Sequence, residues 1–112
     1  QDRNIDVAMY RLVKYINDTF ADKEMPNLTT VELGRWLENT GYLQLPEDGR
    51  NKIPTEKGSA LGIVTEKRVR QATGEIYYIN LYPQAAQQFI FANLPAVAES
   101  LAKEKDEKLA DA

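Results

Sequence analysis

Six side chains between residues 52 and 70 have the chemistry to contact phosphate groups. The chain has a formal net charge of −3, yet residues 50–70 hold six basic residues and only two acidic ones. Lysine and arginine in such a cluster can neutralise DNA phosphates, and a serine hydroxyl can donate a hydrogen bond to a phosphate oxygen. The candidate DNA-binding residues are Lys52, Lys57, Ser59, Lys67, Arg68 and Arg70.

The same residues also have a purely structural interpretation. Arg68 and Arg70 would share one face of a strand with Val69 on the other, as in a solvated edge strand whose charges prevent pairing with another chain. Gly58 and Ser59 would let a short helix approach DNA closely, or let it pack against the preceding helix. Both interpretations stay open for the basic residues, whereas packing is favoured for the two small ones.

Aromatic residues offer a second kind of contact, because rings can stack on nucleobases. Neighbouring residues of a strand point to opposite faces, so only one of Tyr77 and Tyr78 can belong to the core, and the other is a candidate contact. Trp36 lies in an apolar helical stripe, which favours a core position. The aromatic candidates are Trp36, Tyr77, Tyr78 and Tyr82.

Side chains for catalysis or metal binding are scarce. The chain contains no histidine and no cysteine, which removes the commonest general acid–base group, thiolate metal ligands and disulfide bonds. Glu47 and Asp48 are adjacent carboxylates, but Pro-Glu-Asp-Gly is typical of a turn and not of a catalytic cleft. We therefore expect no catalytic residues, no metal, no cofactor and no enzymatic activity.

The first half of the chain predicts two helices and a short strand. Apolar residues at helical spacing predict an amphipathic helix over residues 4–22. The capping box in residues 29–32 begins a second helix, and Gly41 is suited to end it. Residues 42–45 (YLQL) form a short extended piece before the Pro-Glu-Asp-Gly turn.

The second half predicts a short helix, a hairpin and a last helix. Thr55 is a good N-cap for the short helix. Two strand-like runs around residues 72–75 predict a β-hairpin over residues 63–82, and Pro83 opens the last helix. We predict an α+β, winged helix-turn-helix-like domain over residues 1–94, with a small antiparallel β-hairpin as its wing. Residues 95–112 are a charged C-terminal helix or tail.

Two stretches of the sequence resemble a known family. Residues 36–43 (WLENTGYL) and 54–63 (PTEKGSALGI) resemble phrases of the C-terminal domain of phage antirepressors, the KilA-C type, and the resemblance covers about residues 30–92. The chain departs from the family pattern at Glu56, where glutamine is preferred, and at residues 83–85, which replace a threonine–glycine phrase. The resemblance implies a winged-helix-like DNA-binding module without catalytic residues, attached to other domains of phage-related proteins.

The remaining expectations concern partners and location. No apolar run approaches the roughly 20 residues that cross a bilayer, and no signal peptide is evident, so we expect a cytoplasmic protein without membrane contact. The first residue is Gln1, which suggests a domain of a longer protein. DNA is the expected partner. The alternative is a protein-protein interaction or dimerisation module of the same fold without DNA affinity. It would dock a partner or a second copy of itself through its aromatic surface or through the C-terminal helix, whose apolar residues are Leu94, Val97, Leu101 and Leu109.

Overall fold

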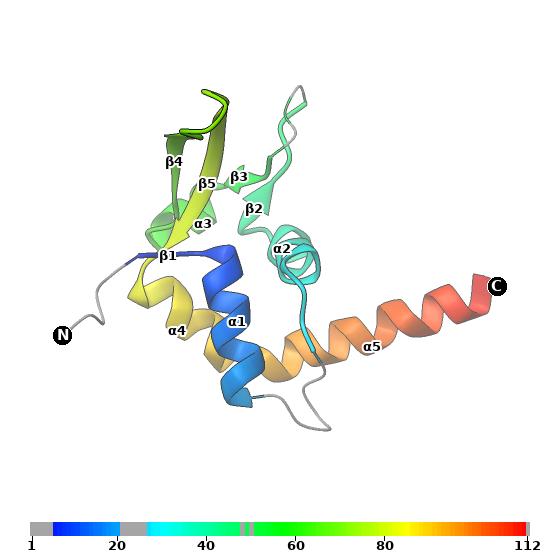
Figure 1. Cartoon of the computed structure of the whole chain (residues 1–112). Helices are drawn as coiled ribbons and strands as arrows, with labels where there is room; N and C mark the ends of the chain where they lie inside the picture. The colour runs from blue at the N-terminus through cyan, green and yellow to red at the C-terminus, as the bar shows by residue number, and fades with distance from the viewer. Residues whose placement is uncertain (1–5, 21–26, 48, 50, 112) are drawn as a thin grey trace.

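The computed structural model of the chain describes residues 6–20, 27–47, 49 and 51–111, with side chains as far as residue 105. Within this part, five helices and two small antiparallel sheets make an α+β fold, which confirms the predicted fold class at this level. Most of the helices lie at one end of the molecule, and a long hairpin projects from the other end (Figure 1). None of the described helices is long and apolar enough to cross a membrane.

The first helix, α1 (Met9–Phe20), begins later than its apolar spacing predicts. Val7–Ala8 instead forms a short strand, β1, which pairs antiparallel with the end of the hairpin. The predicted start of the helix in the range 4–22 is therefore corrected, because pairing with a neighbouring strand outweighs the local helical preference there. The apolar stripe of the helix is buried as expected, through Leu12, Val13 and Ile16.

The second helix, α2 (Thr30–Asn39), begins at the predicted capping box. The Thr29 hydroxyl accepts a hydrogen bond from the Glu32 N–H at 3.1 Å, and the Glu32 carboxylate accepts one from the Thr29 N–H at 3.0 Å. Two N–H groups at the start of the helix thereby gain partners. Trp36 is buried on the inner side of this helix, as predicted.

A small two-stranded sheet separates α2 from α3. β2 (Leu43–Gln44) lies within the predicted extended piece and pairs antiparallel with β3 (Ile53–Pro54), a strand that the sequence did not indicate. Two residues ending in proline show no strand periodicity, so local sequence could not reveal this pairing. α3 (Glu56–Ala60) follows, and Thr55 caps it as predicted.

The predicted hairpin is confirmed. β4 (Val64–Val69) pairs antiparallel with β5 (Ile76–Tyr82), and the connecting loop contains Gly74 at a φ of +73°, a conformation that glycine adopts without steric cost. The strand order is β1-β5-β4. Because β1 pairs only with the last two residues of β5, the outer part of the hairpin stands as a two-stranded ribbon.

Two helices complete the fold. α4 (Gln84–Ala92) begins after Pro83, as predicted, and α5 (Leu94–Asp111) follows it. The core lies between the helices and the base of the hairpin. Its buried apolar residues are Leu12, Val13, Ile16, Leu28, Leu33, Trp36, Leu37, Leu43, Ile63, Tyr82, Ala86, Ile90, Leu94, Val97 and Leu101.

The first turns of α5 share this core with the rest of the chain. Val97 and Leu101 are fully buried or nearly so, and Arg35 of α2 forms an ion pair of 2.6 Å with Glu104. The predicted division after residue 94 therefore falls within one continuous core. Leu94 is also buried, so these three residues contact their own chain, and the side chain of Leu109 lies outside the described part.

Candidate nucleic-acid interface

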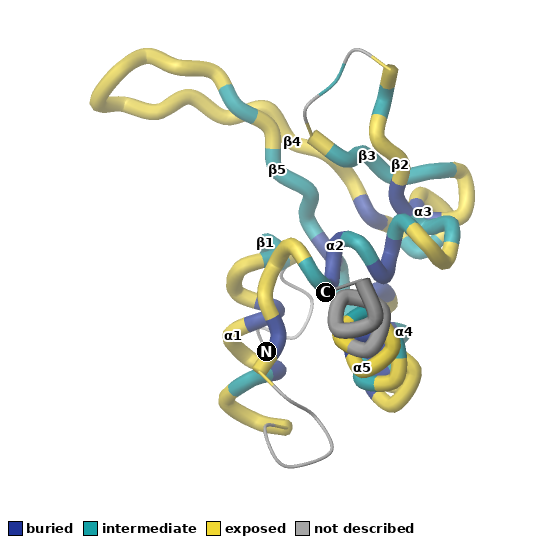
Figure 2. Tube along the Cα trace, turned by 90° about the vertical axis from the view of Figure 1, so that its right-hand side faces the viewer, coloured by how far each residue is buried: buried dark blue, intermediate teal, exposed yellow. Residues whose placement is uncertain are grey.

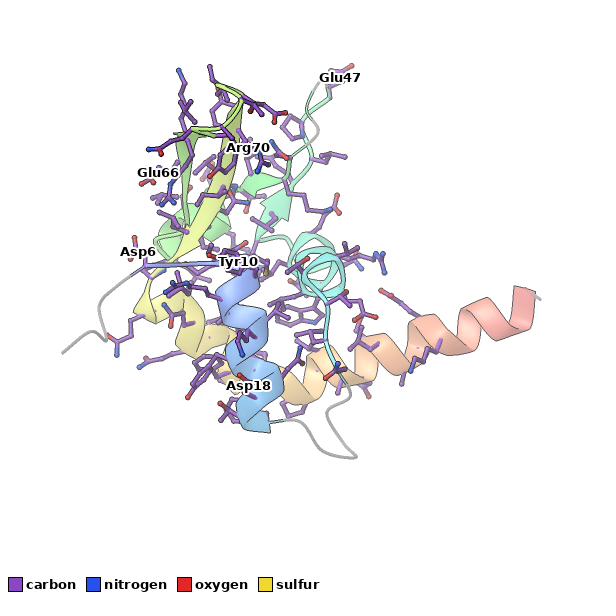
Figure 3. The ribbon with its side chains drawn as sticks, viewed as in Figure 1. Asp6, Tyr10, Asp18, Glu47, Glu66 and Arg70 are labelled. Carbon is purple, nitrogen blue, oxygen red and sulfur yellow. The ribbon has the colours of Figure 1, made fainter. Side chains whose placement is uncertain are left out.

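The hairpin carries three of the six predicted DNA-binding residues on an exposed ribbon. All six residues of β4 are exposed, and Figure 2 shows the ribbon reaching away from the helices with most of its length exposed. Glu66 and Arg70 lie on this ribbon, above Tyr10 at the start of α1 (Figure 3). The hairpin therefore presents its charged side chains to solvent, away from the core.

One face of the hairpin carries both arginines, as the alternation of the strand predicts. The Arg68 Nε donates to a Glu66 carboxylate oxygen at 2.6 Å, and the Arg70 Nε donates to a Glu75 carboxylate oxygen at 3.1 Å. The Arg70 guanidinium also lies 4.8 Å from the centroid of the Tyr77 ring. The hydrogen bond to Glu66 raises the pKa of Arg68 above its ordinary value. Exposed ion pairs of this kind contribute little to stability, so phosphate groups can replace these carboxylates at little cost.

The opposite face of the hairpin carries Lys67 among apolar side chains. Lys67 lies directly across from Tyr78 in the strand register, and Val69 lies across from Ile76. All four of these side chains are exposed. Lys67 makes no ion pair with any residue that the structure describes, in contrast to both arginines.

Lys57 has a different environment from the basic residues of the hairpin. Its Nζ donates to the Thr40 carbonyl oxygen at 3.2 Å and lies 4.5 Å from the centroid of the Tyr42 ring. Thr40 is the C-cap of α2, where the carbonyl groups lack helical partners and a cation is favourable. The structure thus gives Lys57 a role at the end of a helix.

Lys52 likewise lies along α2. Its Nζ is 3.7 Å from a Glu38 carboxylate oxygen, and its Cδ would be 4.0 Å from a Cβ placed on Gly34. Its carbonyl oxygen accepts a hydrogen bond from the Asn80 side chain at 2.8 Å. Arg50, which contributes to the basic excess of the sequence, lies outside the described residues.

Gly58 allows α3 to approach the backbone that follows α2. A Cβ on this residue would lie 2.2 Å from the Tyr42 carbonyl oxygen. Thr55 reinforces the contact, because its hydroxyl donates to the Gly41 carbonyl at 2.6 Å and its N–H donates to the Tyr42 carbonyl at 3.1 Å. The favoured packing role of Gly58 is therefore confirmed, with the correction that it faces the Tyr42 backbone. The sequence also favours packing for Ser59, but this residue is exposed, so the packing prediction is wrong for Ser59.

The tyrosine candidates differ in exposure. Tyr82 is buried at the base of the hairpin, and this burial raises the pKa of its hydroxyl well above the ordinary value. Tyr77 is half-buried beside Arg70, and Tyr78 is exposed on the opposite face. Tyr78 is therefore the more exposed of the two outer tyrosines of the hairpin, and neither Tyr77 nor Tyr78 belongs to the core.

Two surface grooves were not predicted from the sequence. A groove of about 670 Å³ lies between the hairpin and the β2–β3 loop, with Pro46, Asn51 and Ile53 on the loop side. A second groove, of about 370 Å³, runs between α1 and α4 beside Tyr15 and Phe91, whose ring centroids are 5.4 Å apart. Both grooves form between elements distant in sequence, which periodicity does not detect. For the second groove, the sequence did contain a signal, because Tyr15 is an aromatic residue at helical spacing.

Comparison of the chain with protein-family models, with curated proteins and with solved structures finds no match. The antirepressor resemblance therefore stays a prediction.

Proposed function

We propose that this domain is a non-catalytic DNA-binding module that contacts phosphates through its β4–β5 hairpin. The exposed ribbon with Lys67, Arg68 and Arg70 carries this proposal. Basic side chains on a projecting ribbon can reach the phosphates of a duplex without the rest of the domain approaching it. A two-stranded β-ribbon also fits the major groove of B-DNA.

In this proposal, the hairpin is the wing of a winged-helix-like fold. The order of a helix pair, a short third helix and a hairpin supports this comparison. The inserted β2–β3 pair and the five-residue length of α3 differ from a simple helix-turn-helix with a recognition helix in the major groove. The hairpin, and not α3, is therefore the proposed main contact, with Ser59 as an exposed accessory donor.

Fluorescence anisotropy tests this proposal with a labelled 20-base-pair duplex at two salt concentrations. The test variant is Arg68→Glu/Arg70→Glu. The control is Lys103→Glu/Lys105→Glu, which makes the same charge change at exposed positions on α5. We expect affinity to fall with salt for the unaltered domain, and the hairpin variant to lose affinity and flatten the slope of log K against log salt by about 2.

The control separates local contact from overall charge. If both double variants lose affinity equally, binding follows net charge and the hairpin has no special role. If the unaltered domain does not bind duplex DNA at low salt, the proposal is wrong for duplex DNA.

The alternative function, a protein-interaction module, is supported by a different surface. Tyr15, Phe20 and Phe91 form an aromatic group at the α1–α4 groove, with ring centroids 5.4–6.3 Å apart. Tyr15 and Phe20 are exposed there, and exposed aromatics are enriched in protein interfaces. Tyr15→Ser would weaken capture of a partner at this surface without changing DNA affinity.

A further inference from the structure

The apolar face of the hairpin exposes three hydrophobic side chains that lie next to one another. Val69, Ile76 and Tyr78 have 55%, 52% and 49% of their surfaces exposed. They are neighbours on one face, because Val69 pairs with Ile76 and Tyr78 lies two residues further along β5. Exposed apolar side chains that form a contiguous patch can mark a binding surface.

The strand register places a cation next to the exposed ring. The Arg70 N–H donates to the Glu75 carbonyl at 2.8 Å, so hydrogen-bonded pairs alternate from that point along the ribbon. Lys67 and Tyr78 then form a non-hydrogen-bonded pair, in which opposing side chains lie closest. Lys67 has no carboxylate partner in the described part of the chain. The face therefore combines an apolar ring with an unneutralised positive charge.

The groove beside this face has the size of a small-ligand site. Its volume of about 670 Å³ falls within the roughly 300–1,000 Å³ of pockets that hold drug-sized molecules. Figure 2 shows the hairpin and the β2–β3 loop diverging from a common base. Asn51 on the loop wall supplies amide donors and an acceptor, which can pair with base edges. Glu75 also lines the groove, but its carboxylate accepts from Arg70.

We propose that this face binds unpaired nucleobases, with one base stacked on Tyr78 and a neighbouring phosphate on Lys67. The inference rests on the proposed function and deepens it by naming single-stranded DNA as a ligand. A nucleotide carries the planar π-face of its base and an anionic phosphate. These two groups match the Tyr78 ring and the Lys67 ammonium, which lie side by side on the hairpin. Bases within a duplex are already stacked on one another, so only an unpaired strand can use this face.

The test compares single-stranded and duplex DNA on matched variants. Labelled dT20 and a labelled 20-base-pair duplex are titrated with the unaltered domain and with Tyr78→Ala, Tyr78→Phe and Tyr10→Ala. Tyr10 is the control because its side chain is also an exposed tyrosine. We expect Tyr78→Ala to weaken dT20 binding about tenfold, within the range that base–aromatic stacking contributes. Tyr78→Phe and Tyr10→Ala should bind dT20 as the unaltered domain does, and Tyr78→Ala should bind the duplex unchanged.

A second variant tests the phosphate contact. Lys67→Gln should reduce the salt slope for dT20 by about 0.7, the value for one phosphate of a single strand. Circular dichroism confirms that each variant is folded before it is titrated.

Three results would overturn the inference. Equal weakening of duplex and dT20 binding by Tyr78→Ala would mean that the ring supports the shape of the hairpin and does not stack. Salt-dependent duplex binding without any dT20 binding would reject the inference and leave the proposed function intact. Failure to bind either DNA would reject both, and the apolar face would then be assigned to a protein partner.

Discussion

Lys52 and Lys57 contact the body of the domain, whereas the basic residues of the hairpin are exposed on a ribbon. Lys57 donates to the Thr40 carbonyl at the end of α2 and lies over an aromatic ring, while Lys52 extends along the same helix toward Glu38. Lys67, Arg68 and Arg70 stand on a ribbon where every neighbouring side chain of β4 is exposed. The first group, the anchored lysines, contacts the body of the domain, and the second group, the hairpin cations, contacts solvent and exposed carboxylates.

The difference shows that a count of charges does not locate an interface. A cation at a helix C-terminus stabilises the fold through the helix dipole and the unpaired carbonyls. Moving it to a phosphate would lose that contribution. In the described part of the chain, the ion pairs of the hairpin arginines are with exposed glutamates of the same ribbon, where such pairs contribute little. Exchange of these glutamates for phosphates therefore costs little free energy.

The largest expected effect on stability concerns the packing of α3, which carries Lys57, against the backbone of Tyr42. Gly58→Ala should lower the free energy of unfolding by about 2 kcal/mol or more, because its Cβ would lie 2.2 Å from the Tyr42 carbonyl oxygen. Urea denaturation measures the change. Ser59→Ala is the matched control at an exposed position of the same helix, and it should change stability by less than about 0.5 kcal/mol. Similar stability of both variants would show that α3 is not tightly docked.

Gly58 also shows how far the sequence could predict this structure. The short helix, its Thr55 cap and a need for the missing side chain were all evident from local residue types. The neighbour of Gly58 was not, because Tyr42 approaches through a strand pairing, β2 with β3, that has no periodic signal. In the same way, the basic candidates were identified by type, but only the tertiary contacts separate Lys57 from Lys67.

The next prediction concerns Tyr82, which is buried at the base of the hairpin, and the loss of stability at alkaline pH. Burial raises the pKa of Tyr82, so its hydroxyl stays protonated in the folded state after the unfolded chain has ionised, at about pH 10. The unfolded state then binds fewer protons than the folded one, and stability falls as pH rises above 10, by up to about 1.4 kcal/mol per pH unit. Tyr82→Phe should remove this part of the alkaline loss. Denaturation at pH 8 and pH 11 measures it, and an equal fall in both proteins would contradict the prediction.

A smaller effect separates stability from binding at Lys57. Lys57→Gln should destabilise the fold by about 1 kcal/mol, since it removes a cation from the α2 C-terminus and from the face of Tyr42. Duplex affinity at moderate salt should not change. Thermal denaturation and anisotropy on the same preparation measure both quantities. Loss of affinity without loss of stability would place Lys57 in the DNA interface, together with the hairpin cations.

The smallest effect is expected at Lys52. Its separation of 3.7 Å from Glu38 is a partly exposed ion pair, so Lys52→Gln should change stability by about 0.5 kcal/mol or less. Its effect on duplex affinity should also be small. A clear loss of duplex affinity in this variant would move Lys52 into the group of DNA-contacting residues.

The proposal that the hairpin contacts DNA is tested most directly by mapping DNA contacts on the unaltered domain. Amide chemical shifts are followed by NMR during titration with a 20-base-pair duplex at low salt and again at high salt. We predict salt-sensitive shifts over residues 64–78 of the hairpin and little change over residues 52–58. Shifts concentrated at residues 52–58, with the hairpin unaffected, would contradict the proposed interface.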